Sequence, residues 1–186
     1  MRLKTGTIFA GLEARIVAED GSEVPWDGAT VGELECRGPW VATGYYDDPG
    51  LGDRFHDGWL RTGDMAYMEP DGYFKIVDRS KDLVKSGGEW ISSLDLEAAI
   101  MSHPLVREEA VVGVKSLKWD ERPVAVVACV DGVAPTLEDL HAHLRGRVAK
   151  WWLPDDVVVV DEIPKTSVGK FDKKVIRALL ADKVLP

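Results

Sequence analysis

Two apolar stretches in the middle of the chain decide its fold. The first is Glu109-Ala110-Val111-Val112-Gly113-Val114, and the second is Val124-Ala125-Val126-Val127-Ala128-Cys129-Val130. Both have the length of a strand, are rich in valine and stay far below membrane-spanning length. They therefore predict two buried strands of a soluble domain.

Residues with capping chemistry predict three helices around these strands. Ser92 or Ser93, Thr136 and Asp172 each precede a segment with apolar residues at helical spacing. Another strand is expected at residues 157–160. The predicted buried faces of the helices consist of Leu96, Ala99 and Ile100; Leu137, Leu140, Leu144 and Val148; and Val175, Ile176, Leu179 and Leu180.

The first part of the chain reads instead as short strands and turns. Residues 13–19 and 32–38 have strand patterns, and Asp47-Asp48-Pro49-Gly50 is a strong turn signal. Two apolar runs at 65–69 and 73–77 are separated by Pro70-Asp71-Gly72, which predicts a hairpin.

The fold class that follows is α+β. Residues 1–80 are expected to form a β-rich piece and residues 81–186 a small mixed α+β domain, with the joint near residues 78–85. The chain has 186 residues, which is enough for two small domains.

Composition limits the partners. The net charge of −9 disfavours nucleic acid and anionic membranes, because both prefer a basic surface. Cys36 and Cys129 form neither a disulfide framework nor a metal motif, so a reduced, cytoplasmic setting is expected. The beginning of the chain lacks a secretory signal.

Histidine and tryptophan side chains show no ligand pattern. The histidines have no metal spacing and are read as surface residues, so no metal site is predicted. The tryptophans Trp119, Trp151 and Trp152 are predicted to be packing residues.

The segment with the clearest chemical signal is Pro164-Lys165-Thr166-Ser167-Val168-Gly169-Lys170-Phe171. Gly169 permits backbone angles that other residues adopt at a cost, and Lys170 supplies a point charge on a polar loop. Phosphate chemistry needs a cation where negative charge gathers. The alternative is a solvated turn with ordinary surface lysines.

Two further segments carry weaker signals. In Arg61-Thr62-Gly63-Asp64 the carboxylate after glycine is suited to ribose hydroxyls, although Gly-Asp is also common in turns. Residues 78–90 place charged residues before Gly87-Gly88 and Trp90, as a flexible joint before a ligand-facing loop would. The alternative interpretation of residues 78–90 is a surface strand followed by a Gly-Gly turn.

In this order, the motifs resemble the adenylate-forming superfamily of acyl-CoA synthetases, luciferases and peptide-synthetase adenylation domains. The resemblance extends over nearly the whole chain. It rests on Gly32-Glu33-Leu34 with Gly44-Tyr45-Tyr46, Arg61-Thr62-Gly63-Asp64, Asp78-Arg79-Ser80-Lys81-Asp82, and Pro164-Lys165-Thr166 with Gly169-Lys170. The stretches at residues 85–93 and 150–154 resemble the medium- and long-chain fatty-acyl-CoA synthetase branch.

The resemblance assigns roles to individual residues. Asp64 matches the carboxylate that binds the ATP ribose, Arg79 matches its assistant, and Lys81 matches a hinge. Lys170 matches the lysine that bridges the acyl carboxylate and the α-phosphate. After adenylation the small domain rotates and presents the loop from Lys85 to Trp90 for attack by the CoA thiol. The resemblance also places positions matching Lys81, Lys85 and Trp90 near the nucleotide. The cofactor-binding positions that it implies beside Asp64 and Arg79 are Lys81, Gly87, Gly88, Glu89 and Trp90, with Lys85 counted as catalytic.

The resemblance also implies substrates and limits. ATP, CoA and a fatty acid are the expected partners, and Mg²⁺ is the expected metal of the full enzyme. Whether the full enzyme forms a homodimer is left open. This chain lacks the family's phosphate loop, its magnesium-binding glutamate and its acyl pocket. It is therefore expected to be the carboxy-terminal end of the large domain plus the whole mobile lid, inactive alone and without strong ATP binding. The alternatives are a non-catalytic nucleotide-binding or interaction module, and a ligase for aryl or short-chain acids.

Overall fold

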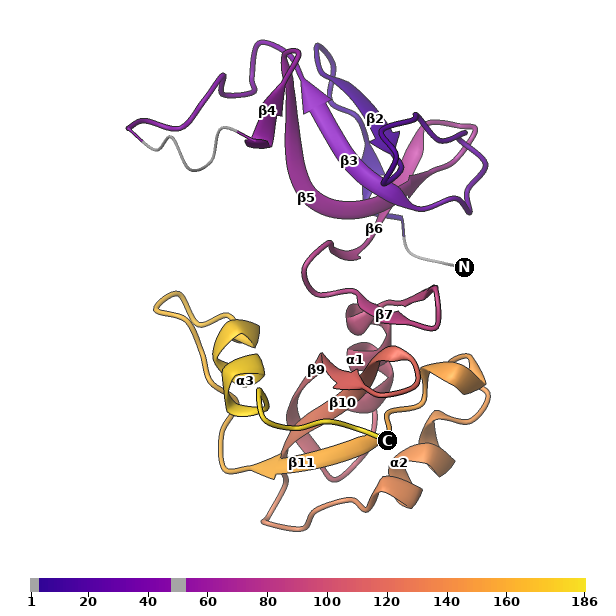
Figure 1. Ribbon diagram of the computed structural model, residues 1–186, viewed down its shortest axis with the longest axis vertical. Coiled ribbons are helices and arrows are strands. Elements are labelled where there is room, and N and C mark those ends of the chain that lie inside the picture. The colour runs from indigo at the N-terminus through magenta and orange to yellow at the C-terminus, as the bar shows by residue number, and fades with distance from the viewer. Residues whose placement is uncertain (1–3, 48–52) are drawn as a thin grey trace. The chain divides into compact units, whose positions relative to one another are not determined.

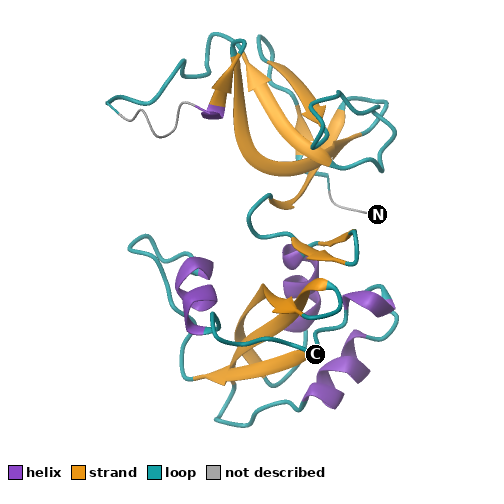
Figure 2. Ribbon diagram, viewed as in Figure 1, coloured by secondary structure: helices purple, strands orange, loops and turns teal. Residues whose placement is uncertain are grey.

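The computed structural model describes residues 4–47 and 53–186, and Figures 1 and 2 show its course. The chain divides into two compact units, the first ending at Lys81 and the second beginning at Asp82. Asp48, Pro49 and Gly50 of the predicted turn lie outside the described residues. That residues 81–186 act as a mobile lid stays a prediction.

The described part of the first unit is an antiparallel sheet with the strand order β1-β6-β5-β3-β2, and β4 pairs with β5. Its core is formed by Ile16, Leu34, Ala66 and Met68. The strands are β1 (Gly6–Thr7), β2 (Glu13–Val17), β3 (Gly32–Arg37), β4 (Phe55–His56), β5 (Trp59–Met68) and β6 (Tyr73–Arg79).

The predicted hairpin is confirmed as β5 and β6. Glu69 N–H donates to the Tyr73 carbonyl at 2.7 Å, and Gly72 closes the turn with φ of +81°. Strand β5 begins earlier than expected, so that Asp64 lies within it and pairs with Arg79 across the ladder. A register shift between Met65 and Ala66, and not the turn alone, places Arg79 opposite Asp64.

The second unit contains a mixed sheet of order β11-β10-β7-β8, with β9 paired to β10. Strands β10 and β11 are parallel and are connected through α2 and η2, whereas the other pairs are antiparallel. The elements are β7 (Val84–Ser86), β8 (Glu89–Ile91), α1 (Ser93–Met101), β9 (Val106–Ser116), β10 (Asp120–Cys129), α2 (Leu137–Leu144), η2 (Lys150–Trp152), β11 (Asp156–Val160) and α3 (Lys173–Leu179).

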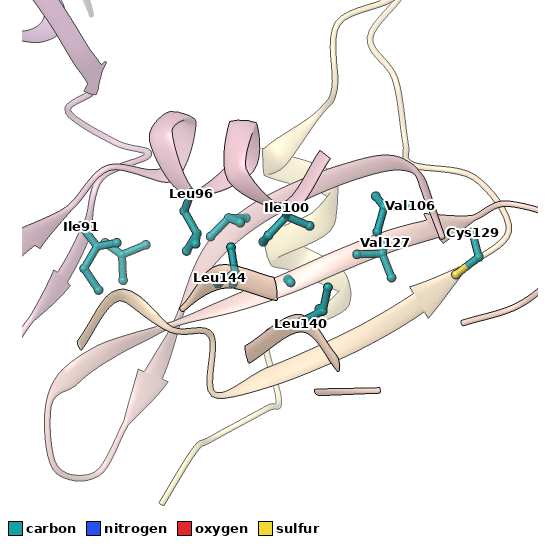
Figure 3. Close-up of a cluster of buried hydrophobic side chains, with 11 residues drawn as sticks. Ile91, Leu96, Ile100, Val106, Val127, Cys129, Leu140 and Leu144 are labelled. Carbon is teal, nitrogen blue, oxygen red and sulfur yellow. The ribbon is translucent and has the colours of Figure 1, made fainter. Parts of the chain in front are cut away.

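Strands β9 and β10 are buried on both faces, which explains their continuous apolar sequences. Val111 and Val127 point into a core with α1 and α2, whose side chains are drawn in Figure 3. Val112 and Val126 belong to a second core with Ile176 of α3. The prediction of two buried strands is confirmed, and the sheet separates the helices into two layers.

All three predicted helix caps are present. Ser92 Oγ accepts the Asp95 N–H at 3.1 Å, and Thr136 forms a reciprocal capping box with Asp139. The Asp172 carboxylate accepts backbone N–H groups in the first turn of α3. These contacts fix where each helix begins.

The buried faces of two helices differ from the prediction. Helix α2 ends at Leu144, and Val148 reaches the same core from the following turn. In α3 only the edge with Ile176 and Leu180 packs on the sheet, whereas Val175 and Leu179 are 42% and 68% exposed. The prediction for the last two is wrong, because a helix this short contacts the sheet along a single row of residues.

Not all histidines lie at the surface. His103 is buried, and its ring stacks edge-on against His143 with centroids 5.0 Å apart. Burial and the neighbouring His143 lower the pKa of His103. The surface prediction is therefore wrong for His103.

The free edge of β9 is covered by contacts from elsewhere in the unit. The Val111 N–H donates to Glu97 Oε1 of α1 at 2.9 Å. Near the end of the strand, Leu185 pairs with Ser116, with backbone bonds of 2.9 and 3.0 Å.

In the part of the chain that the structure describes, no helix is long and apolar enough to cross a bilayer.

Candidate functional site

The first candidate site is an ion pair on the β5–β6 ladder. Arg79 Nε lies 2.7 Å from Asp64 Oδ1, and the Asp64 N–H donates to Thr62 Oγ1 at 3.1 Å. Gly63 has φ of +75°, which glycine adopts readily just before the carboxylate. A carboxylate offers about four lone-pair sites, so Asp64 can accept further hydrogen bonds beside Arg79.

Asp78, the residue before Arg79 in β6, is buried next to this ion pair. Its side chain is 1% exposed, and its Oδ1 accepts the backbone N–H of Arg79 at 2.7 Å. The aspartate thus holds the backbone from which Arg79 reaches toward Asp64. It stabilises the ladder without occupying the site.

The second candidate site is the β7–β8 hairpin. Lys85 pairs with Trp90 and Ser86 with Glu89, so Gly87 and Gly88 form its two-residue turn. Both glycines have positive φ, +60° and +84°, as the tightest hairpin turns require. The Lys85 ammonium lies 5.2 Å from the centre of the Trp90 ring, a cation–π distance.

A pocket of about 370 Å³ opens beside this hairpin. Trp119 and Trp151, 43% and 42% exposed, contribute indole surface to it. Trp152 packs against the core as predicted, whereas Trp119 and Trp151 remain partly exposed beside the pocket. The remaining lining residues are Ser86, Gly87, Glu89 and Arg122.

The third candidate site is the loop that carries Lys170. The Thr166 N–H donates to the Lys170 carbonyl at 2.7 Å, and Gly169, with φ of +78°, closes the turn. At one flank Lys165 forms ion pairs with Glu108 and Glu162 at 2.8 and 3.0 Å. The Lys170 N–H donates to Thr166 Oγ1 at 3.2 Å, and among the described residues none pairs with the Lys170 ammonium, which is exposed at the tip.

At the other flank a buried polar cluster anchors the loop. Lys173 Nζ lies 2.6 Å from both Ser93 Oγ and Glu97 Oε1. Glu109 is 3% exposed, and its Oε2 has no hydrogen-bond partner within the described segments. Burial, assisted by the charge of Glu97 and opposed by Lys173, raises the pKa of Glu109 to about 9, so this carboxyl is neutral at pH 7.

The predicted residues thus fall into three groups. Asp64 and Arg79 meet in the first unit, whereas Lys85, Gly87, Gly88, Glu89 and Trp90 share the hairpin of the second unit. The loop before α3 lies elsewhere on that unit, away from β7 (Figure 1). Lys81 is the last residue of the first unit. A hinge at Lys81 remains a prediction, as do all the catalytic and binding roles.

Comparisons with known proteins identify the class. Residues 95–170 match the family model of the AMP-binding enzyme C-terminal domain. The long-chain-fatty-acid–CoA ligase of Thermus thermophilus is 48% identical over 95% of this chain and 33% of its own length. A 3-methylmercaptopropionyl-CoA ligase of Ruegeria lacuscaerulensis is 46% identical over 90% of this chain and 31% of its own.

Solved structures agree with these sequence matches. ATP-bound MatB of Rhodopseudomonas palustris superposes with a TM-score of 0.84 at 33% identity, covering 96% of this chain and 36% of that one. The o-succinylbenzoate CoA synthetase of Bacillus subtilis, in complex with an acyl-adenylate, gives 0.83 at 30% identity, covering 97% and 36%.

Residues 95–170 thus match the C-terminal domain of AMP-binding enzymes, the relatives are CoA ligases, and the structural neighbours are adenylate-forming enzymes. The fold and the ordered motifs agree with this similarity. The chain spans about a third of the length of the curated relatives it matches.

Proposed function

We propose that the protein carrying this chain is an AMP-forming acid–CoA ligase that activates fatty acids. The observation that carries the proposal is the Lys170 loop, where the flanking lysines are engaged and a single ammonium is left at the tip. The long-chain ligase at 48% identity supports the substrate class. ATP, CoA and a fatty acid are the proposed substrates.

In the first half-reaction, Lys170 would stabilise the meeting of two anions. A carboxylate oxygen attacks the α-phosphorus of ATP, the bond to the β-phosphate oxygen breaks, and pyrophosphate leaves with the electron pair. The lysine ammonium neutralises charge that accumulates in the transition state without transferring a proton. An exposed lysine on a closed turn can reach a substrate held elsewhere.

The first unit would hold the nucleotide by its sugar. Asp64 accepts ribose hydroxyls while Arg79 keeps its carboxylate oriented at 2.7 Å. Lys81, at the junction of the two compact units, would be the hinge. These roles are proposals that rest on the family motif and on the ion pair.

In the second half-reaction, the CoA sulfur attacks the acyl carbon and AMP departs, while the thiol proton is lost to solvent or base. We assign this step to the hairpin of Lys85, Gly87, Gly88, Glu89 and Trp90. The neighbouring pocket offers the faces of Trp119 and Trp151 to a planar ring, and the adenine of CoA supplies such a ring.

Mg²⁺ is expected to accompany ATP in this reaction. Within residues 4–47 and 53–186, no group of three His, Cys, Asp or Glu side chains is placed to hold a metal ion. We therefore assign no metal ligand in this chain and derive no step through the metal.

A second candidate is a ligase for a short-chain acid. The similarity to the 3-methylmercaptopropionyl-CoA ligase favours it, at 46% identity. The two candidates share all the chemistry above and differ only in the acid.

The test is product analysis with the full-length ligase that carries this chain. It is incubated with ATP, Mg²⁺, CoA and a panel of acids from propionate to palmitate, and AMP and acyl-CoA are quantified. We expect both products in equal amounts, with the best kcat/KM for a medium- or long-chain acid. ADP instead of AMP, or no thioester with any acid, would refute the proposal. A preference for short acids would select the second candidate.

A further inference from the structure

Arg122 of β10 joins three segments around the pocket. Its side chain is 11% exposed and faces Asp155, with Nη2 at 2.7 Å and Nε at 3.0 Å from the carboxylate. Nη1 donates to Ser86 Oγ at 3.0 Å and to the Trp151 carbonyl at 2.8 Å, and Nη2 donates to the Leu153 carbonyl at 3.0 Å. One guanidinium therefore links β7, η2 and the start of β11.

These contacts connect residues that line the pocket, among them Ser86, Arg122 and Trp151. Ser86 is followed by Gly87, whose N–H donates to the Trp119 carbonyl at 2.9 Å. Trp151, bonded through its carbonyl, provides the opposite indole wall. The position of each wall relative to the other thus depends on the same side chain.

A guanidinium is suited to linking three segments of backbone. It is planar and carries five donors in a rigid fork, whereas a lysine ammonium is a point charge that cannot span three segments. Asp155 neutralises its charge, so the group serves geometry more than attraction of an anionic ligand. With its donors bonded to protein acceptors, Arg122 has little capacity left for a substrate.

We propose that Arg122 is a positioning residue for thioester formation, which rests on the function proposed above. It holds the Gly87 turn and the Trp151 wall at the separation that CoA requires. It does not touch the reacting atoms. Losing it lets the two walls move independently, which weakens CoA binding and misplaces the hairpin.

The half-reactions separate this role from general support of the fold. The Lys170 loop belongs to the same unit, so loosening of the whole unit would slow adenylation as well. A positioning role confined to the pocket slows only the step after adenylation. Positional errors near one ångström cost on the order of 100-fold in rate.

The experiment uses the full-length ligase and two assays. Pyrophosphate release from ATP and fatty acid reports adenylation, and acyl-CoA formation from pre-made acyl-adenylate reports thioester formation. Arg122→Met removes the donors, Arg122→Lys keeps the charge, and Ser86→Ala deletes one acceptor. Arg107→Met is the matched control, because Arg107 also donates to two backbone carbonyls, those of Cys129 and Asp161, outside the pocket.

We expect Arg122→Met to slow thioester formation by about 10- to 100-fold and to raise the KM for CoA. Adenylation should stay within about threefold, corresponding to less than 1 kcal/mol. Arg122→Lys should fall between wild type and Arg122→Met. Arg107→Met should leave the ratio of the two half-reactions unchanged.

Other results would overturn the inference. An equal fall in the rates of both half-reactions would show that Arg122 only stabilises the fold. An unchanged rate of thioester formation would show that Arg122 has no role in that step. If Arg122→Met does not fold, Ser86→Ala decides, since it must raise the KM for CoA while adenylation is preserved. Absence of thioester formation in the wild-type enzyme would instead refute the proposed function.

Discussion

The loop with Lys170 and the hairpin with Lys85 are built in different ways within one unit. The loop is tied at its flanks, by Lys165 to Glu108 and by Lys173 to Glu97, and its tip is exposed. The hairpin is tied at its centre, where Gly87 bonds to Trp119 and Ser86 to Arg122.

The difference matches two kinds of task. A charge that must reach a substrate needs a secure base and a mobile end, whereas a binding wall needs fixed shape. In the loop the ion pairs lie outside the turn and leave the Lys170 side chain exposed, whereas in the hairpin the contacts hold the turn itself. We therefore expect the loop to be sensitive to loss of charge and the hairpin to added volume.

The largest effect expected from this comparison is on the loop. Lys170→Ala should lower the rate of adenylation by about 10²- to 10³-fold, because it removes the only charge proposed to act on the transition state there. Thioester formation from pre-made acyl-adenylate should stay within a few-fold. Pyrophosphate and acyl-CoA assays on the full-length ligase measure both.

Lys174→Ala is the control for Lys170→Ala, since Lys174 is an exposed lysine of the adjoining helix. It should leave both half-reactions unchanged. An equal fall in both half-reactions with Lys170→Ala would contradict the division of labour between loop and hairpin.

The next effect tests the sensitivity of the hairpin to volume. In Gly87→Ala the added Cβ would lie 2.9 Å from Trp119 Cε3, and the left-handed backbone adds roughly 1–2 kcal/mol of strain. Thioester formation should fall by about tenfold or more, while adenylation is retained. Gly88→Ala is the matched control, because it carries similar strain with nothing within 4 Å of the new Cβ. Equal effects of the two substitutions would show that strain, and not contact with Trp119, dominates.

A smaller effect concerns the buried cluster beneath the loop. The pKa of Glu109 is raised from 4.5 to about 9, so the folded state retains a proton that the unfolded chain releases. Stability should therefore fall as pH rises from about 4.5 to about 9, and then level off. In Glu109→Gln this contribution disappears, and the variant should gain stability over wild type as pH increases toward 9.

Thermal unfolding midpoints between pH 5.5 and 9.5 measure this dependence. Glu138→Gln, the same substitution at an exposed position of α2, should keep the slope of the wild type. Parallel curves for wild type and Glu109→Gln would mean that Glu109 titrates as an ordinary carboxyl.

The smallest effect is expected at the exposed flank of the loop. Lys165→Ala removes ion pairs with Glu108 and Glu162, but exposed pairs contribute little. Adenylation should fall by less than about fivefold, because the backbone bond from Thr166 to Lys170 persists. A loss as large as that of Lys170→Ala would show that the flank, and not the tip, governs the chemistry.

Local chemistry explains what could be predicted from the sequence. Ser92, Thr136 and Asp172 cap their helices because a capping oxygen meets N–H groups only two or three residues away. The β5–β6 hairpin is predictable from its turn, Pro70-Asp71-Gly72, whereas the pairing of Asp64 with Arg79 also depends on the register shift between Met65 and Ala66. In such cases the partners are close in sequence.

Long-range contacts explain what could not be predicted. Arg122 meets Ser86 at a separation of 36 residues and Trp151 at 29, and no pattern near Arg122 indicates either partner. For the same reason, the sequence does not indicate that Trp119 and Trp151 line one pocket. Composition alone also could not show which row of α3 reaches the sheet, so Leu179 was expected to be buried.

The covered edge of β9 has a consequence for self-association. An exposed strand edge is a template on which another chain can add a strand, and such addition leads to aggregation. Here the Glu97 carboxylate accepts the Val111 N–H and Leu185 pairs beside Ser116, so the edge is partly blocked by a side chain and a tail. Glu97 also pairs with Lys173 at the flank of the Lys170 loop. The same carboxylate therefore anchors this loop and blocks part of the β9 edge against strand addition by another copy of the protein.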